Sequence, residues 1–280
     1  MKTKGMIAWI ALIATTPLQA ENIEGNEKLV TKNIQIDDYT AIQISNINQS
    51  GNSFKSLFSF ITSGGKSSCC PQVYYQQGNK TTLKVTTDEN ILPVLTFRVE
   101  NNELRIQAKE GIYISPSKLL IETSSKDLKK LSIGGGTDFF LKSALNTESL
   151  EANISGGGNM EFKESAKIQS ASFSISGGGD LDATQLTCEE IYIKVSGGGD
   201  ANVAGKAQRA EMKVSGGGDL NARDLQVDHV ICDVSGGGDI TVYAVEQLEA
   251  HASGGGDIYY KGNPKTDTSC SGGGDIHHIN

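Results

Sequence analysis

The chain is poor in the residues and runs that would identify several protein classes. The apolar run near the N-terminus, from Met6 to Ala14, is nine residues long, whereas a membrane-spanning helix needs about 20 apolar residues. Its only tryptophan, Trp9, lies inside this run, and only 5 residues of 280 are proline. Lysine and arginine form no basic stripe, which is the footprint of nucleic-acid binding. We therefore expect neither a transmembrane protein nor a nucleic-acid partner.

The first 20 residues have the pattern of a secretory signal peptide. Lys2 and Lys4 precede the apolar run, and Ala20 is the small residue expected before the cleavage site. We expect an exported mature chain from Glu21, located in the periplasm, at the cell surface or outside the cell. Removing the two lysines changes the formal net charge from −8 to −10. No cysteine follows the apolar run directly, so no lipoprotein anchor is expected.

The five cysteines are an odd number, so a complete disulfide framework is not expected. Cys232 and Cys270 occupy repeat positions that elsewhere hold Val, Met, Ile or Ala. We interpret them as small buried hydrophobic residues. The adjacent pair Cys69 and Cys70 has no assigned role.

One five-residue motif recurs through the second half of the chain. Ser-Gly-Gly-Gly-Asp or a close variant occurs eight times, at intervals of 18 to 21 residues. Such a period is typical of repeat architectures. The copies lie at 134–138, 155–159, 176–180, 196–200, 215–219, 235–239, 253–257 and 271–275.

Apolar and polar residues alternate on both sides of each motif, which predicts strands with one buried face. Stacked coils bury such faces against one another. We therefore predict an all-β protein, a parallel β-helix (β-solenoid) of roughly 20-residue coils, with eight coils over residues 131–280. The residues before the serine form one apolar column: Ile154, Ile175, Val195, Val214, Val234, Ala252 and Cys270. Those after the aspartate form another: Phe139, Met160, Leu181, Ala201, Leu220, Ile240, Ile258 and Ile276.

The motif itself has two interpretations. If the chain stays extended, the first and third glycines point inward, where two walls approach closely, and Ser, middle Gly and Asp point outward. If the chain bends, the glycines supply positive φ and the aspartate closes an Asx-type turn. Both place the motif at the surface.

Residues 21–130 lack the motif but are also rich in strand patterns, so we expect them to continue or cap the solenoid. A segment at about 51–72, rich in Ser and Gly with several apolar residues, interrupts the pattern and is interpreted as an inserted loop. The expected strands include 34–36, 41–44, 82–85, 97–99, 104–106 and 119–121.

The repeated Ser-Gly-Gly-Gly-Asp motif, the segment Ile258 to Pro264 and the upstream segments 88–92 and 102–106 resemble the head GIN domain family of putative auto-transporter adhesins. Family members commonly have Ser or another small residue where this chain has the middle glycine. The resemblance implies an exported parallel β-helix with an adhesin role and no catalytic residues.

The motif also carries the sharpest candidate site, a surface ladder of one polar residue per coil. Like charges about 4.8 Å apart repel unless they are bridged, so calcium is one ligand to consider. Calcium β-rolls, however, use a nine-residue repeat with ligands from successive turns. A structural or solvated ladder is therefore preferred, and no metal or cofactor is assigned. Its members are Asp138, Asn159, Asp180, Asp200, Asp219, Asp239, Asp257 and Asp275.

Catalytic patterns are absent from the sequence. The four histidines lie late in the chain, without a Gly-x-Ser-x-Gly elbow or zinc-ligand spacing. We predict a non-catalytic envelope protein, an adhesin-like or structural solenoid whose long flat face, or whose insertion at 51–72, contacts a surface glycan, an envelope protein or a copy of itself. The unpaired edge of the last coil is also expected to favour self-association. A polysaccharide lyase or hydrolase on the same scaffold is the alternative. Tyr243, Tyr259 and Tyr260 are considered as a surface for sugar stacking, with Tyr260 assigned to the core by alternation.

Overall fold

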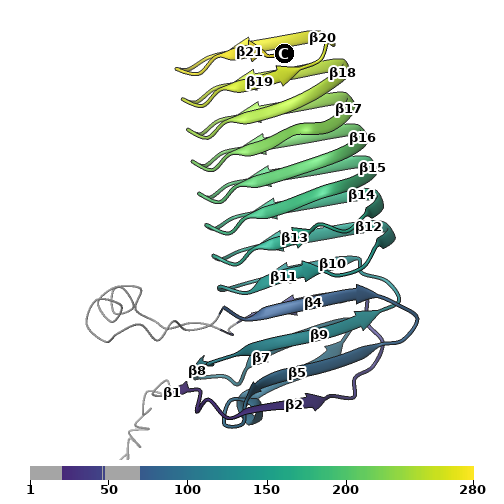
Figure 1. Cartoon of the computed structure of the whole chain (residues 1–280). Helices are drawn as coiled ribbons and strands as arrows, with labels where there is room; N and C mark the ends of the chain where they lie inside the picture. Colours follow the sequence, from purple (N-terminus) through teal and green to yellow (C-terminus); the bar gives the residue numbers. More distant parts are fainter. Residues whose placement is uncertain (1–20, 46, 48–69) are drawn as a thin grey trace, which may run out of the picture.

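The computed structural model describes residues 21–45, 47 and 70–280. The expected signal peptide, Cys69 and nearly all of the expected insertion at 51–72 lie outside the described residues. Within them the protein is almost wholly β structure, and η1 (Leu92–Val94) is a short 3-10 helix. No described helix is long and apolar enough to cross a bilayer. The predicted all-β solenoid is confirmed: strands stack coil upon coil from the N-terminal to the C-terminal end (Figure 1).

Nine strands precede the glycine-rich repeats: β1 (Glu21–Glu24), β2 (Leu29–Asn33), β3 (Ala41–Ile44), β4 (Gln72–Gln77), β5 (Thr82–Asp88), β6 (Leu95–Glu100), β7 (Glu103–Ala108), β8 (Ile112–Ser115) and β9 (Leu119–Ser125). The repeats contain β10 (Lys130–Ile133), β11 (Asp138–Leu141), β12 (Leu145–Ile154), β13 (Met160–Phe162), β14 (Ala166–Ile175), β15 (Leu181–Val195), β16 (Ala201–Val214), β17 (Leu220–Val234), β18 (Ile240–Ala252), β19 (Ile258–Lys261), β20 (Lys265–Cys270) and β21 (Ile276–His278).

Each repeat contributes to two parallel walls joined at a glycine corner, the five-residue motif. We call the strand segments that enter the corners the first wall and those that leave them the second wall. In the first wall, Ser172 pairs with Tyr192, and the register continues through Glu211 to Ile231. Every pairing within the repeats is parallel, and the register of this row is unbroken from Ser172 to Ile231, so equivalent side chains of the first wall line up along the rod.

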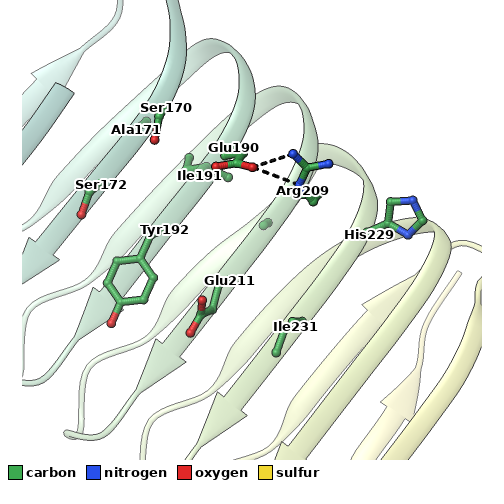
Figure 2. Close-up of a pocket in the computed structure, with 11 residues that line it drawn as sticks. Ser170, Ala171, Ser172, Glu190, Ile191, Tyr192, Arg209, Glu211, His229 and Ile231 are labelled. Atoms are coloured by element: carbon green, nitrogen blue, oxygen red, sulfur yellow. Dashed lines mark hydrogen bonds and ion pairs between the residues drawn. The ribbon is translucent and has the colours of Figure 1, made fainter. Parts of the chain in front are cut away.

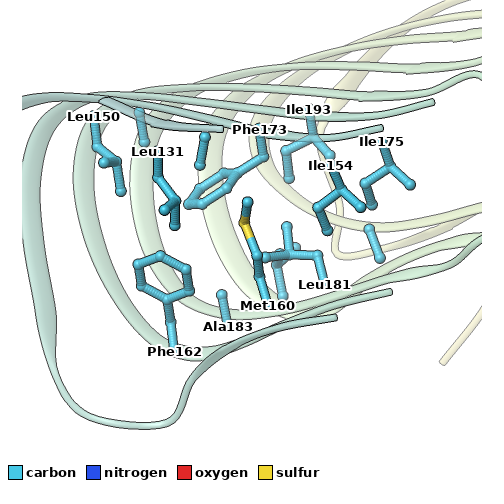
Figure 3. Packing of buried hydrophobic residues seen from close by; sticks show 14 of the residues in the cluster. Leu131, Leu150, Ile154, Met160, Phe162, Phe173, Ile175, Leu181, Ala183 and Ile193 are labelled. Atoms are coloured by element: carbon cyan, nitrogen blue, oxygen red, sulfur yellow. The ribbon is translucent and has the colours of Figure 1, made fainter. Parts of the chain in front are cut away.

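The core consists of the apolar columns that alternation predicts. All members of the column before the serine are buried except Cys270, which is exposed. The interpretation of Cys270 as buried was wrong: β20 is the last strand of the first wall, it pairs with β18, and all six of its residues are exposed. Cys232 is fully buried, as expected. Aromatic rings add to the core near the start of the repeats, where Phe139, Phe162 and Phe173 lie with successive centroids 5.8 Å apart. Figure 3 shows Phe162 and Phe173 between the two walls.

The glycine corners bend, and both interpretations of their glycines need correction. A Cβ on Gly177 would lie 2.1 Å from the carbonyl oxygen of Gly156 in the preceding coil, and one on Gly179 would meet Gly158 in the same way. The first and third glycines therefore permit close stacking along the rod, not the approach of opposite walls. Positive φ is also not their role, since among the corner glycines only Gly135 has it. A Cβ on the middle glycine, Gly178, would meet nothing within 4 Å.

The N-terminal strands extend both walls and close the end. β3 pairs in parallel with β10 and β7, and β4 with β11 and β9, whereas β2, β5 and β6 add antiparallel pairings. The strand expected at 34–36 does not form, because pairing of β2 with β5 ends near Asn33; Ile34 and Ile36 instead pack against the core.

The buried Asp88 fixes this N-terminal end. Its carboxylate accepts hydrogen bonds from the backbone N–H groups of Glu27 (2.7 Å) and Ser117 (2.8 Å) and from the Ser117 hydroxyl (2.6 Å). Burial alone would raise the pKa of Asp88, but the hydrogen bonds from Ser117 and Glu27 outweigh burial and hold the pKa below its usual value.

Candidate functional site

The predicted ladder forms a continuous hydrogen-bonded line on the corner surface. From Asp138 to Asp257, one side-chain oxygen of each ladder residue accepts a hydrogen bond from the backbone N–H of the ladder residue in the next coil, at 2.7 to 3.0 Å. For example, Asp180 Oδ1 accepts from Asp200, whose own Oδ1 accepts from Asp219, both at 2.8 Å. The structure thus brings together all eight residues: Asp138, Asn159, Asp180, Asp200, Asp219, Asp239, Asp257 and Asp275.

This geometry assigns the ladder side chains a structural task. The bond between coils needs only a side-chain oxygen that accepts, not a charged group: the uncharged Asn159 accepts from the backbone N–H of Asp180 in the same way. Where charge is present the bond is strengthened: the backbone N–H of Asp275, followed by the Tyr259 hydroxyl, lowers the pKa of Asp257. No group of three or more His, Cys, Asp or Glu side chains arranged to hold a metal occurs among residues 21–45, 47 and 70–280.

A second feature lies on the outer face of the first wall, across β14 to β17. Here a hollow of about 340 Å³ opens between the small outward residues of β14 and larger ones on the following strands. Ser170 and Ser172 form its low side, and Tyr192 stands beside them on β15 (Figure 2). Ile231 is 41% exposed at its far end on β17. We call this feature the Tyr192 hollow.

The charged side chains around the Tyr192 hollow are paired with one another. Arg209 Nε lies 3.1 Å from Glu190 Oε1 (Figure 2), and Lys213 Nζ lies 2.7 Å from Glu211 Oε1. The hollow therefore offers no unpaired full charge from these four groups. The other accessible groups are serine and tyrosine hydroxyls, the Tyr192 ring, the Ile231 side chain and the imidazole of His229, which lies 3.5 Å from Glu246 Oε2.

Sequence reasoning missed this hollow because it concentrated on the repeated motif. The relevant signal lies in the outward-facing residues of the first wall. One row of them pairs strand to strand in the order Glu151, Ser172, Tyr192, Glu211, Ile231, Glu249 and Asp267. Tyr192 and Ile231 are the apolar members of this otherwise polar row.

A further groove, of about 580 Å³, lies near the N-terminal end beside β4, β5 and β9. Its aromatic side chain, Tyr74, is already covered: the Lys142 ammonium lies 4.4 Å from the ring centroid and Phe140 packs edge-on at 5.2 Å. Lys84 is paired with Glu122 at 2.7 Å. The aromatic ring and the charged side chains of this groove are therefore already in contact with partners inside the protein.

The tyrosines considered for sugar stacking are similarly engaged. Lys261 lies over Tyr243 at 5.0 Å, and His277 stacks on Tyr259 at 5.3 Å. Tyr260 packs against the core and contacts His278. Their ring faces are therefore partly occupied.

Comparisons with known proteins agree with the fold. A family model described as "Putative auto-transporter adhesin, head GIN domain" matches the chain over residues 66–169 and again over 153–264. No curated protein matches.

Several solved structures are similar over nearly the whole chain. A "putative lipid binding protein" from Parabacteroides distasonis is 28% identical, with 93% of this chain and 100% of that chain covered and a TM-score of 0.80. A "putative adhesin" from Parabacteroides merdae is 24% identical, with the same coverage and a TM-score of 0.81. A "putative adhesin" from P. distasonis is also 24% identical, covers 92% and 100%, and has a TM-score of 0.79. At 24% identity the likeness concerns the fold alone.

Proposed function

The chain belongs to the head GIN domain family of putative auto-transporter adhesins, and from this premise we propose that it is a non-catalytic, exported envelope protein that binds a surface molecule. The binding surface is an outer face of the solenoid, where side chains can vary without disturbing the stacked core. The signal-peptide pattern of residues 1–20 supports export to the periplasm or cell surface.

The observation that carries the non-catalytic assignment is the bonding of the ladder. A lyase or hydrolase needs a carboxyl group free to transfer a proton or attack the substrate. Each ladder side chain followed by another coil instead uses an oxygen to hold that coil's backbone N–H, as in the 2.8 Å bond from Asp219 to Asp200. The most regular acidic residues of the protein thus serve the stack.

The surface ligands proposed are a glycan and an envelope protein. One similar structure carries the name of a lipid binding protein. Side chains such as Met160, Phe162 and Phe173 fill the space between the walls (Figure 3). A lipid would therefore have to lie against an outer face of the repeats.

The test is a binding assay with the mature chain. Fluorescently labelled protein is incubated with a panel of bacterial and host cell surfaces and with purified envelope polysaccharides, and retained protein and newly released sugar ends are measured together. We expect retention without release. Release of sugar ends would instead establish the lyase or hydrolase alternative, and absence of retention on every surface would contradict the binding function.

A further inference from the structure

Among the described tyrosines, Tyr192 is unusual because neither its ring nor its hydroxyl makes a polar or ring contact. Tyr39 and Tyr75 are buried and hydrogen-bonded, and Tyr74 is covered by Lys142. Tyr113 on β8 shares the freedom of Tyr192 but lies far from the repeats (Figure 1). A half-buried tyrosine offers an apolar ring face and a polar tip, a combination enriched at binding surfaces.

The surroundings of Tyr192 form a shelf of the right shape for a flat, hydroxyl-rich ligand. Ser170 and Ser172 precede Glu190 and Tyr192 in register, so the wall steps from short side chains to tall ones. In Figure 2 the tyrosine ring stands at this step, and Glu211 and Ile231 follow in the same row. Three inter-strand steps give a row of roughly 14 Å, enough for a short oligosaccharide.

The charges select the ligand class. Of the basic side chains that line the hollow, Arg209 is paired with Glu190, and His229 lies 3.5 Å from Glu246. Lys213, nearby, is paired with Glu211, so an anionic headgroup would have to compete with carboxylates for these groups. Carboxylate oxygens and serine and tyrosine hydroxyls retain acceptor and donor positions for sugar hydroxyl groups.

Strand addition by a peptide is also disfavoured here. The hollow lies in the middle of the first wall, and its strands already pair on both sides through Ser172, Tyr192 and Glu211. Main-chain hydrogen bonding, which gives extended peptides their affinity, needs a free sheet edge. A peptide would have only side-chain contacts in this place.

We propose that the Tyr192 hollow on β14 to β17 is a binding subsite for a neutral glycan, with a sugar ring lying on the serine side against the face of Tyr192. The Glu190 and Arg209 pair bounds the subsite on one side, and Ile231 contacts the apolar face of a following unit. The subsite deepens the proposed surface-binding function and rests on it.

The experiment uses the mature chain and an immobilised array of neutral and anionic oligosaccharides, with anionic phospholipid vesicles as a separate probe. Tyr192→Ala should weaken binding to the neutral glycans by about tenfold or more, as expected for an aromatic anchor. Tyr113→Ala is the matched control and should bind as the parent does. Ser172→Phe fills the shelf without removing Tyr192 and should also weaken binding. Far-UV circular dichroism and the Tm must agree among the variants.

Each other outcome overturns the inference. Equal binding by the parent, Tyr192→Ala and Ser172→Phe would place the glycan elsewhere. Binding only to anionic glycans, vesicles or proteins would refute the ligand class while leaving the surface-binding function intact. Failure of the parent on the array together with failure on every cell surface would remove both proposals.

Discussion

Close stacking at the glycine corners predicts a sharp difference between two neighbouring glycines. In the coil that ends at Asp200, a Cβ on Gly199 would lie 2.1 Å from the carbonyl oxygen of Gly179 and 2.8 Å from its carbonyl carbon. A Cβ on Gly198 would meet nothing within 4 Å. Both residues have a φ that other amino acids adopt, because neither lies in the positive range. Gly199→Ala should therefore destabilise the protein and Gly198→Ala should not.

The size of the effect follows from the contacts that must open. Ordinary van der Waals contact begins near 3.4 Å, so the two coils would separate locally by about 1 Å. The N–H groups of Gly198 and Gly199 donate to the Gly177 carbonyl oxygen at 3.0 and 3.1 Å, and both bonds would lengthen beyond the useful range. Two lost hydrogen bonds together with overpacking amount to about 3 to 5 kcal/mol. Gly198→Ala should stay within about 0.5 kcal/mol of the parent.

The assay is urea unfolding of the mature chain, followed by far-UV circular dichroism, with midpoints compared at equal slope. The expected order of midpoints is Gly198→Ala close to the parent and Gly199→Ala well below it. Equal midpoints for the two variants, or a lower one for Gly198→Ala, would show that stacking of the corner backbones does not require the glycines.

Other measurements test the ladder, the N-terminal end and the core. Asp200→Asn should keep the hydrogen bond to Asp219, whereas Asp200→Ala should lower the Tm because it removes the acceptor; equal Tm values would contradict the bond's contribution. Chelator or added calcium should leave the Tm unchanged. The lowered pKa of Asp88 means that its contribution to stability is present above the ordinary pKa and is lost as pH falls through the lowered one; the fall in Tm below about pH 4 should be shallower in Asp88→Asn. Burial raises the pKa of the Cys188 thiol to about 12, so a variant that keeps only this cysteine should react with a thiol reagent in denaturant and not in native buffer.

Most of the fold could be predicted because alternation and period are encoded in every repeat. The columns through Ile154 and Met160 follow directly from counting residues on either side of the motif. The role of the glycines could not be obtained in this way, since counting assumes an extended chain and the corner bends. Only the stacked structure places Gly179 against the backbone of Gly158.

The ladder and the Tyr192 hollow differ in how the sequence encodes them. The ladder repeats, so its residues stand out, but its bonding partner is the next coil, which a single repeat does not contain. The hollow depends on differences among repeats: serines on one strand and Tyr192 on the next. This change from small to large side chains on neighbouring strands can be recognised only when the register that pairs Ser172 with Tyr192 is known.

The repeats differ in length, from 18 to 21 residues, and a difference in length between neighbouring coils can shift the residues of a shared site out of alignment. The register shows how the site is preserved. The register shifts lie before the row in each strand pair, at Ala183/Leu186, Asn202/Ala204, Ala222/Gln226 and Val227/His229. The row from Ser172 to Ile231 remains in unbroken step. Because backbone pairing, the corners and the inner columns hold the stack, the outward side chains of four coils are free to diverge and still meet at one place.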